Sequence, residues 1–121
     1  MTDFAAIAEG YIALWNARDP AQRRALLARQ WTGDASYVDP LMQAEGHDGI
    51  EGLIAGVQQR FPDFRFRLRG AATGHGSHVR FSWSLGPDAA DEPIQGTDFV
   101  ELADDRIRRV TGFLDKVPEG A

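Results

Sequence analysis

Asp98 is the residue of this sequence whose setting most clearly suggests acid–base chemistry. The run from Ile94 to Leu102 alternates as a β-strand does, so Asp98 shares a face with aliphatic side chains. Burying an ionised carboxylate is so costly that its surroundings must supply hydrogen-bond donors or raise its pKa until it keeps its proton. Both outcomes are typical of a pocket that performs chemistry or binds a polar ligand. The alternative is a bulge that turns Asp98 toward solvent.

Asp39 and Tyr11 are two further candidates. Asp39 ends a short strand-like run, Ser36-Tyr37-Val38-Asp39, which Pro40 stops, and it shares a face with Tyr37. Tyr11 lies in the middle of an apolar helical stripe. A buried tyrosine hydroxyl needs a hydrogen-bond partner, and a nearby carboxyl group would supply one.

Three helices are predicted in the first half of the chain. Thr2 or Asp3 can cap the first helix. The second has Asp19 as its N-cap and Pro20 at its first helical position. The third is capped by Asp48 and ends before Pro62. The short strand at 36–39 and a loop over 41–47 separate the second helix from the third. The apolar stripes of these helices comprise Phe4, Ile7, Ala8, Tyr11, Ile12 and Trp15, then Leu26, Leu27 and Trp31, and finally Ile50, Leu53, Ile54, Val57 and Phe61.

After Pro62 the spacing of apolar residues changes to the period of a β-strand and stays there. Turns at 74–77, 86–93 and 103–105 divide this half into four antiparallel strands, which gives an α+β domain. Helices covering one side of a curved sheet would leave a concave cavity between the layers. The aromatic residues that either line such a cavity or belong to the core are Trp15, Trp31, Tyr37, Phe61, Phe66, Trp83 and Phe113.

The composition excludes several classes of function. The chain has 121 residues, which is about one domain spanning 1–121, and a net charge of -5, which argues against nucleic-acid binding. It has no cysteine, and its three histidines lack the spacing of a metal site, so no metal is expected. No signal peptide or membrane-spanning run is recognised, so we expect a cytoplasmic protein with no membrane partner.

Several short motifs, in this order and spacing, resemble the nuclear-transport-factor-2-like superfamily. Within it, the sequence is similar to the SnoaL-like polyketide cyclases and the ketosteroid isomerases. The motifs are Tyr11-Ile12-Ala13-Leu14, Tyr37-Val38-Asp39-Pro40, Phe61-Pro62-Asp63 and Gly96-Thr97-Asp98-Phe99. The resemblance implies a cone-shaped, curved antiparallel sheet with three helices packed on its concave side.

The resemblance also implies roles for the three candidate residues. The residue that matches Asp39 in ketosteroid isomerases is an aspartate base, which moves a proton next to a carbonyl group. The residues that match Tyr11 and Asp98 are a tyrosine and a protonated aspartate, which bind the enolate oxygen. In the cyclases the position of Asp98 is the acid/base of an aldol closure. Neither reaction uses a cofactor. We therefore expect an isomerase or cyclase acting on a small hydrophobic ring-containing ketone, or else a non-catalytic small-molecule binding or interaction module.

A homodimer is also expected. The outward face of the predicted sheet mixes charged, polar and aromatic residues, which suits a polar interface better than open solvent. These residues are Arg80, Ser82, Gln95, Thr97, Phe99 and Glu101. The resemblance also implies a two-fold dimer through this face.

Overall fold

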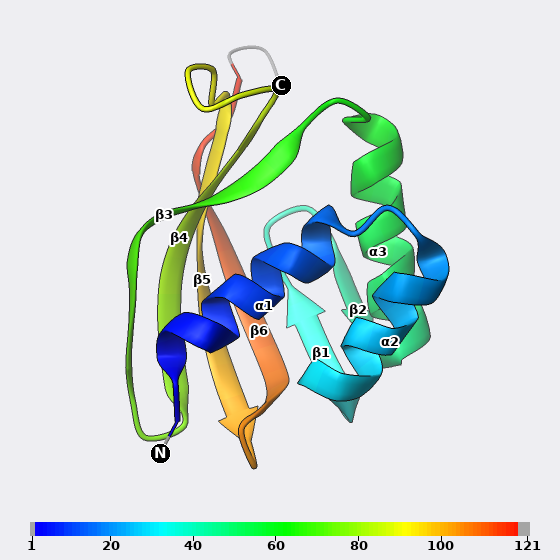
Figure 1. The fold of residues 1–121 in the computed structure, drawn as a ribbon, viewed down its shortest axis with the longest axis vertical. Helices are drawn as coiled ribbons and strands as arrows, with labels where there is room; N and C mark the ends of the chain where they lie inside the picture. The colour runs from blue at the N-terminus through cyan, green and yellow to red at the C-terminus, as the bar shows by residue number, and fades with distance from the viewer. Residues whose placement is uncertain (1, 119–121) are drawn as a thin grey trace.

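The computed structural model describes residues 2–118, which form three helices and one six-stranded sheet. The strand order is β2-β1-β6-β5-β4-β3, and the helices lie together on one face of the sheet (Figure 1). The elements are α1 (Phe4–Asn16), α2 (Pro20–Gln30), β1 (Trp31–Val38), β2 (Gln43–Glu45), α3 (Gly46–Arg60), β3 (Arg65–His75), β4 (His78–Gly86), β5 (Ile94–Ala103) and β6 (Arg106–Lys116). The predicted α+β fold with three helices over a curved sheet is confirmed.

The first two helices begin where the sequence predicts. Asp3 caps α1 by accepting a hydrogen bond from the Ala6 amide, and Asp19 caps α2 by accepting one from the Ala21 amide. The prediction for α3 is wrong by three residues, because β2 runs directly into the helix: the N-cap is Glu45 instead of Asp48, and the helix begins at Gly46. Asp48 therefore lies in the first turn, where its negative charge favours the helix dipole without acting as the cap.

The sheet differs from the prediction on its β1 side. The four strands from β3 to β6 are antiparallel neighbours, as expected, but β1 pairs with β6 in parallel. β1 begins at Trp31, which was assigned to the buried side of α2, and β2 forms within the predicted loop by pairing with β1. Pairing with β6, which is distant in the sequence, thus makes β1 longer than the strand at 36–39 that the alternation of apolar residues predicts.

The core lies between the helices and the inner face of the sheet. Alternate residues of β4 and β5, including Phe81, Trp83, Asp98 and Val100, face the helices and are buried. Register shifts in β3 and β6 interrupt the ladders, and Gly70 adopts a positive φ at the shift in β3. Bulges of this kind bend and twist a sheet, which lets it curve around the helices.

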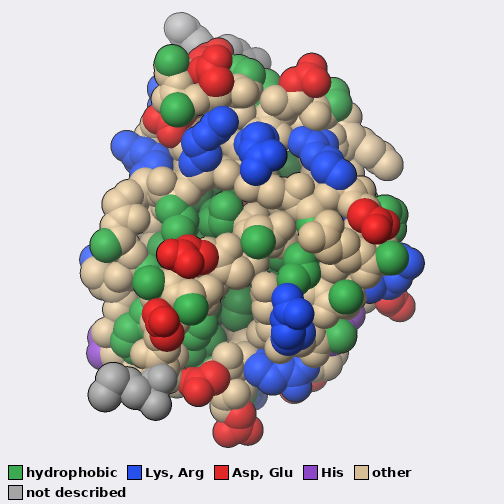
Figure 2. All heavy atoms as spheres, viewed as in Figure 1, with side chains coloured by type: hydrophobic (Ala, Val, Ile, Leu, Met, Phe, Trp, Pro, Cys, Tyr) green, Lys and Arg blue, Asp and Glu red, His purple; other side chains and the backbone are tan. Residues whose placement is uncertain are grey.

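The face of the molecule that carries the helices has separate charged side chains with apolar and other atoms between them. Figure 2 shows this face, with a row of basic side chains across its upper part and apolar side chains visible below them. Within residues 2–118, no helix is long and apolar enough to cross a membrane.

The outer face of the sheet carries two neighbouring hollows of about 500 and 540 Å³, which share Thr73, Arg80 and Phe99. Phe99 and Phe113 are 45% and 51% exposed there and meet edge to face, with ring centroids 5.7 Å apart.

Candidate active site

Asp98 and Tyr11 form a buried hydrogen-bonded pair. The Tyr11 hydroxyl donates to Oδ2 of Asp98 at 2.5 Å, although the two residues are 87 positions apart in the chain. Asp98 is only 1% exposed and points toward the helices, so the alternative in which a bulge turns it outward is wrong. Its second oxygen, Oδ1, is also buried and has no hydrogen-bond partner among the described residues.

Burial determines the proton affinity of this pair. It raises the pKa of Asp98 to about 6, and the hydrogen bond from Tyr11 and the nearby indole of Trp83 offset part of that rise. The negative charge of Asp39 adds a smaller increase. Burial, followed by the charge of Asp98, likewise raises the pKa of Tyr11 well above its ordinary value. Asp98 can therefore exchange a proton near neutral pH, while Tyr11 remains a hydroxyl donor.

Asp39 lies at the end of β1 in a tight turn that orders its carboxylate. The amides of Leu41 and Met42 donate to Oδ1 at 2.8 and 2.9 Å, and the Tyr37 hydroxyl donates to Oδ2 at 2.7 Å. Such turns are typical of Asp before Pro, because the short side chain can accept from amides two and three residues ahead. Burial and then the charge of Asp98 raise the pKa of Tyr37 as well, so it too acts as a donor.

Gly112 lies between Asp98 and Asp39. It lies opposite Asp98 in the β5–β6 ladder. A Cβ atom at this position would lie 2.9 Å from Oδ1 of Asp98, 3.2 Å from Cβ of Asp39 and 3.6 Å from Oη of Tyr37. Asp98, Asp39 and Tyr37 therefore surround one point on β6 that a side chain larger than hydrogen would occupy.

An aromatic cluster encloses the Tyr11–Asp98 pair. The Tyr11 ring stacks on Trp31 at 6.0 Å, meets Phe81 edge to face at 4.9 Å and lies 6.1 Å from Trp15. Trp15 also lies 5.6 Å from the ring of Tyr37. Phe81 was missed as a site residue, although it alternates with polar residues on β4. Only its pairing with Asp98 across the ladder places it at the site.

The structure separates Phe113 from the other predicted pocket residues. Phe61 stacks on Phe64 at the partly exposed side of the core, with centroids 5.1 Å apart. Phe113 instead lies on the outer face of the sheet, where it borders a hollow with Phe99. The prediction that Phe113 lines the same cavity as Asp98 is therefore wrong. Its neighbour Gly112 faces inward, so the alternation of β6 turns Phe113 outward.

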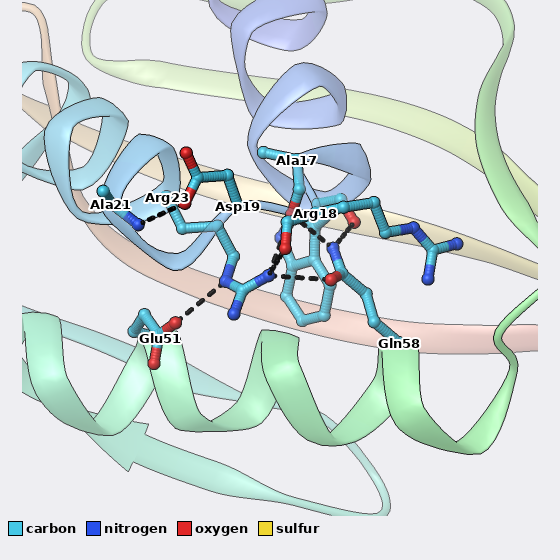
Figure 3. A network of polar contacts seen from close by, with 8 residues as sticks. Ala17, Arg18, Asp19, Ala21, Arg23, Glu51 and Gln58 are labelled. Atoms are coloured by element: carbon cyan, nitrogen blue, oxygen red, sulfur yellow. Dashed lines mark hydrogen bonds and ion pairs between the residues drawn. The ribbon is translucent and has the colours of Figure 1, made fainter.

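A buried arginine positions the helix that carries Tyr11 and Trp15. Arg23, on α2, is 5% exposed and bridges the end of α1 to α3 (Figure 3). It donates to the carbonyls of Ala17 and Arg18, to Oε1 of Gln58 and to Oε1 of Glu51, the last at 2.8 Å. Sequence analysis missed this network, because an arginine in the middle of a polar helix gives no sign that it is buried.

Asn16 fixes the other side of the same helix end. Its side-chain amide donates to the carbonyl of Phe66 at 2.9 Å and accepts from the amide of Phe66 at 2.8 Å. β3 is an edge strand, so Asn16 satisfies main-chain groups that a further strand would otherwise pair with. This contact holds Phe66 against Trp15, with ring centroids 5.4 Å apart.

The site offers proton-transfer groups rather than metal ligands. Among residues 2–118, no cluster of three histidine or acidic side chains could hold a metal ion. What the site presents is a buried carboxyl with one unpaired oxygen, a second carboxylate beside it and two tyrosine hydroxyls. Such groups can remove a proton from a ligand and return it at another atom.

Comparison with known proteins assigns the chain to a family. Residues 8–110 match the SnoaL-like domain, so this protein belongs to the SnoaL-like family. A comparison with curated proteins finds no match.

Solved structures agree with this assignment. A candidate isomerase of the SnoaL-like family from Agrobacterium tumefaciens is 47% identical, covers 91% of this chain and 95% of its own, and has a TM-score of 0.86. A candidate ketosteroid isomerase from Kribbella flavida is 21% identical, with 98% and 82% coverage and a TM-score of 0.70. A candidate SnoaL-like polyketide cyclase from Jannaschia is 17% identical, with 95% and 90% coverage and the same score. The Kribbella and Jannaschia proteins are so distant in sequence that their similarity shows a shared fold alone.

Proposed function

We propose that this protein is a cofactor-independent isomerase or cyclase that moves protons on a small hydrophobic ring-containing ketone. The observation that supports this most directly is the Tyr11–Asp98 pair, whose unpaired oxygen lies beside Asp39 at Gly112. A carboxyl with a raised pKa next to an ordered carboxylate is a suitable acid and base pair. The name of the relative from Agrobacterium is consistent with an isomerase.

The proposed reaction conserves protons. Asp39 removes a proton from the carbon next to the carbonyl, while Asp98 donates a proton from Oδ1 to the carbonyl oxygen, which gives an enol. In an isomerisation, Asp39 returns its proton to a different carbon and the enol oxygen returns its proton to Asp98. In a cyclisation, the enol carbon instead attacks a second carbonyl, whose oxygen takes the proton held by Asp39, while the enol proton returns to Asp98. Tyr11 keeps its hydrogen bond to Oδ2 and thereby stabilises the carboxylate that forms.

One observation favours the alternative of a binding module. Asp98 is almost fully buried, and the two hollows described above lie on the opposite face of the sheet. A ligand that only binds could use Asp98 as a fixed hydrogen-bonding group without any proton leaving the site.

Turnover of β,γ-unsaturated cyclic ketones, including 3-keto steroids, distinguishes the two functions. The wild type is expected to form the conjugated enone, which is followed by its absorbance. Asp39→Asn should reduce turnover by roughly a hundredfold or more, because the amide is not a base. Asp34→Asn, an exposed change on the same strand, is the control and should retain activity. Binding of these ketones without turnover by the wild type would favour the binding module.

We also propose that the protein forms a two-fold homodimer through the outer face of the sheet. Arg69, Arg80 and Arg109 border the hollows there together with Glu101 and Asp115. A two-fold axis would let basic groups of one copy meet acidic groups of the other and would cover the exposed rings of Phe99 and Phe113.

A further inference from the structure

The three tryptophans of this chain share an unusual property. The indole nitrogens of Trp15, Trp31 and Trp83 are all buried, and none has a hydrogen-bond partner within residues 2–118. A buried donor without a partner costs about 1–3 kcal/mol relative to one that is satisfied. Native structures therefore rarely tolerate such groups without a reason, and several in one cluster suggest that something else satisfies them.

Two of the three indoles adjoin the Tyr11–Asp98 pair. Trp15 follows Tyr11 by one helical turn, and the centroids of their rings lie 6.1 Å apart. Burial and the charge of Asp98 raise the pKa of Tyr11, and the Trp15 indole offsets a small part of that rise. The Trp83 indole likewise lowers the pKa of Asp98 and so offsets part of the increase that burial causes. Among the described residues neither indole N–H has a hydrogen-bond partner of ordinary geometry.

Gly96 explains how Trp83 comes so close to the carboxyl. A Cβ atom on Gly96 would lie 2.3 Å from Cζ2 and 2.7 Å from Cε2 of Trp83, and Cε2 is bonded to the indole nitrogen. Gly96 and Asp98 lie on the same face of β5, two residues apart. The absence of a side chain at Gly96 therefore lets the nitrogen side of the indole lie next to Asp98.

Phe66 connects the two indoles. Its ring lies 5.4 Å from Trp15 and 5.2 Å from Trp83, and both contacts are edge to face. Unlike the indoles, Phe66 is only partly buried, and it belongs to the edge strand β3. Both indoles thus converge on the ring of Phe66, which is partly exposed.

From this convergence we infer that the indole N–H groups of Trp15 and Trp83, together with Oδ1 of Asp98, bind one oxygen atom of the ligand. Two donors that cannot accept require an oxygen with free lone pairs, such as that of a ketone or its enolate. The site would then bind a ketone oxygen, and its hydrogen bonds would strengthen as negative charge develops on that oxygen. This inference rests on the proposed function and adds two substrate-contacting residues to it.

Trp31 provides a matched comparison. Within residues 2–118 its indole is buried and unpaired like the others and stacks on Tyr11, but the ring of Phe66 contacts Trp15 and Trp83 instead. If ligand binding merely disturbs the aromatic cluster, the NMR signals of all three indole N–H groups should shift. If the ligand accepts hydrogen bonds from the indoles as inferred, only the signals of Trp15 and Trp83 should shift.

The test is a proton–nitrogen NMR spectrum of the protein labelled at its three indole nitrogens, with each signal assigned from a Trp→Phe variant. The probe is 4-nitrophenol, whose oxygen mimics an enolate, and its binding is followed independently by its absorbance. The control ligand is 4-nitroanisole, in which the oxygen is methylated. We expect 4-nitrophenol to shift the Trp15 and Trp83 proton signals downfield and to leave Trp31 nearly unchanged, while 4-nitroanisole produces neither downfield shift.

The outcomes separate this inference from the proposed function. Equal shifts at all three indoles, or the same shifts with 4-nitroanisole, would overturn the inference, and so would binding of 4-nitrophenol without indole shifts. Absence of 4-nitrophenol binding would overturn the inference, whereas the proposed function would still be decided by the turnover of cyclic ketones. As a second measurement, Trp83→Phe should weaken 4-nitrophenol binding roughly tenfold relative to 4-nitroanisole, since one hydrogen bond to a charged oxygen is lost. Trp31→Phe should change both affinities in parallel.

Discussion

Gly112 and Asp98 face each other across the β5–β6 ladder, and the glycine leaves no room for a side chain beside the buried carboxyl. The space that a Cβ would fill lies within 2.9 Å of Oδ1, the oxygen that the proposed chemistry uses. Asp39 borders the same space from β1. The space between the two proposed acid–base residues is therefore kept open by a residue that has no functional group of its own.

Gly112→Ala should consequently damage the site more than the fold. The added methyl group must displace either the Asp98 carboxyl or β1, which we expect to cost about 1–3 kcal/mol of unfolding free energy. Turnover, or affinity for 4-nitrophenol, should fall by more than tenfold, because small displacements strongly reduce catalysis. Chemical denaturation and ligand titration measure the two effects.

Gly33→Ala is the control for this prediction. Gly33 also lies in a strand, β1, but a Cβ there would have no heavy atom within 4 Å. This variant should retain wild-type stability and binding to within experimental error. Full binding by Gly112→Ala would show that the two carboxyl groups do not depend on this close contact.

The stability of the wild type should fall as pH rises through the pKa of Asp98. The folded state holds the proton of Asp98 up to a pH of about 6, whereas the unfolded chain releases it near 3.8. Protonated Asp98 thus stabilises the fold fully below the lower value, and this contribution is lost progressively up to the higher one. The loss amounts to about 3 kcal/mol.

Asp98→Asn should lack this pH-dependent loss. The amide oxygen can still accept from Tyr11, so we expect the unfolding free energy above pH 7 to change by less than about 1 kcal/mol or to increase. Asp98→Leu removes the acceptor and should destabilise the protein by leaving the Tyr11 hydroxyl buried and unpaired. Denaturation curves of all three proteins between pH 4 and 9 measure these differences. A loss of several kcal/mol in Asp98→Asn would mean that the carboxylate is ionised and held by donors.

Arg23→Met should destabilise the protein by about 3 kcal/mol, because it leaves Glu51 without its buried partner and frees two carbonyls at the end of α1. The double variant with Glu51→Gln should recover part of this loss. Arg24→Met, an exposed change on the same helix, serves as the control in thermal unfolding. Equal stability of the Arg23 and Arg24 variants would show that the network contributes little.

The proposed dimer should have a mass near twice 13.3 kDa in light scattering at micromolar concentrations. Arg80→Glu should shift it toward the monomer, because Arg80 lies where the two hollows of the outer face meet and the new charge would repel acidic groups of the second copy. Arg24→Glu, on the helical side, should remain dimeric. A monomeric wild type would exclude this interface.

Sequence patterns predicted the residues whose environment depends on local periodicity. Alternation within β5 was enough to place Asp98 inward, and the helical stripe was enough to bury Tyr11, so their meeting could be anticipated. The patterns could not predict contacts that depend on the register between distant strands. The parallel pairing of β1 with β6 and the position of Gly112 are of this kind.

Phe113 was misplaced and the burial of Arg23 was missed because both residues depend on features that residue spacing within one element does not reveal. Phe113 was grouped with the pocket by its residue type alone, whereas the shifted register of β6 decides which face it occupies. The burial of Arg23 arises where the start of α2 meets the end of α1 and the side of α3, which no single helix reveals.

The pairing of β1 with β6 also has a consequence for how the protein folds. β1 finds its parallel partner only in the final strand, and Tyr11 finds its acceptor 87 residues later, so much of the native structure depends on long loop closures. Chains with many such contacts fold slowly. During synthesis the three helices emerge first, and their apolar faces lack the inner face of the sheet until β6 leaves the ribosome. We therefore expect nascent chains that end before Arg106 to bind chaperones or aggregate, and the Tyr11–Asp98 hydrogen bond to be among the last native contacts to form.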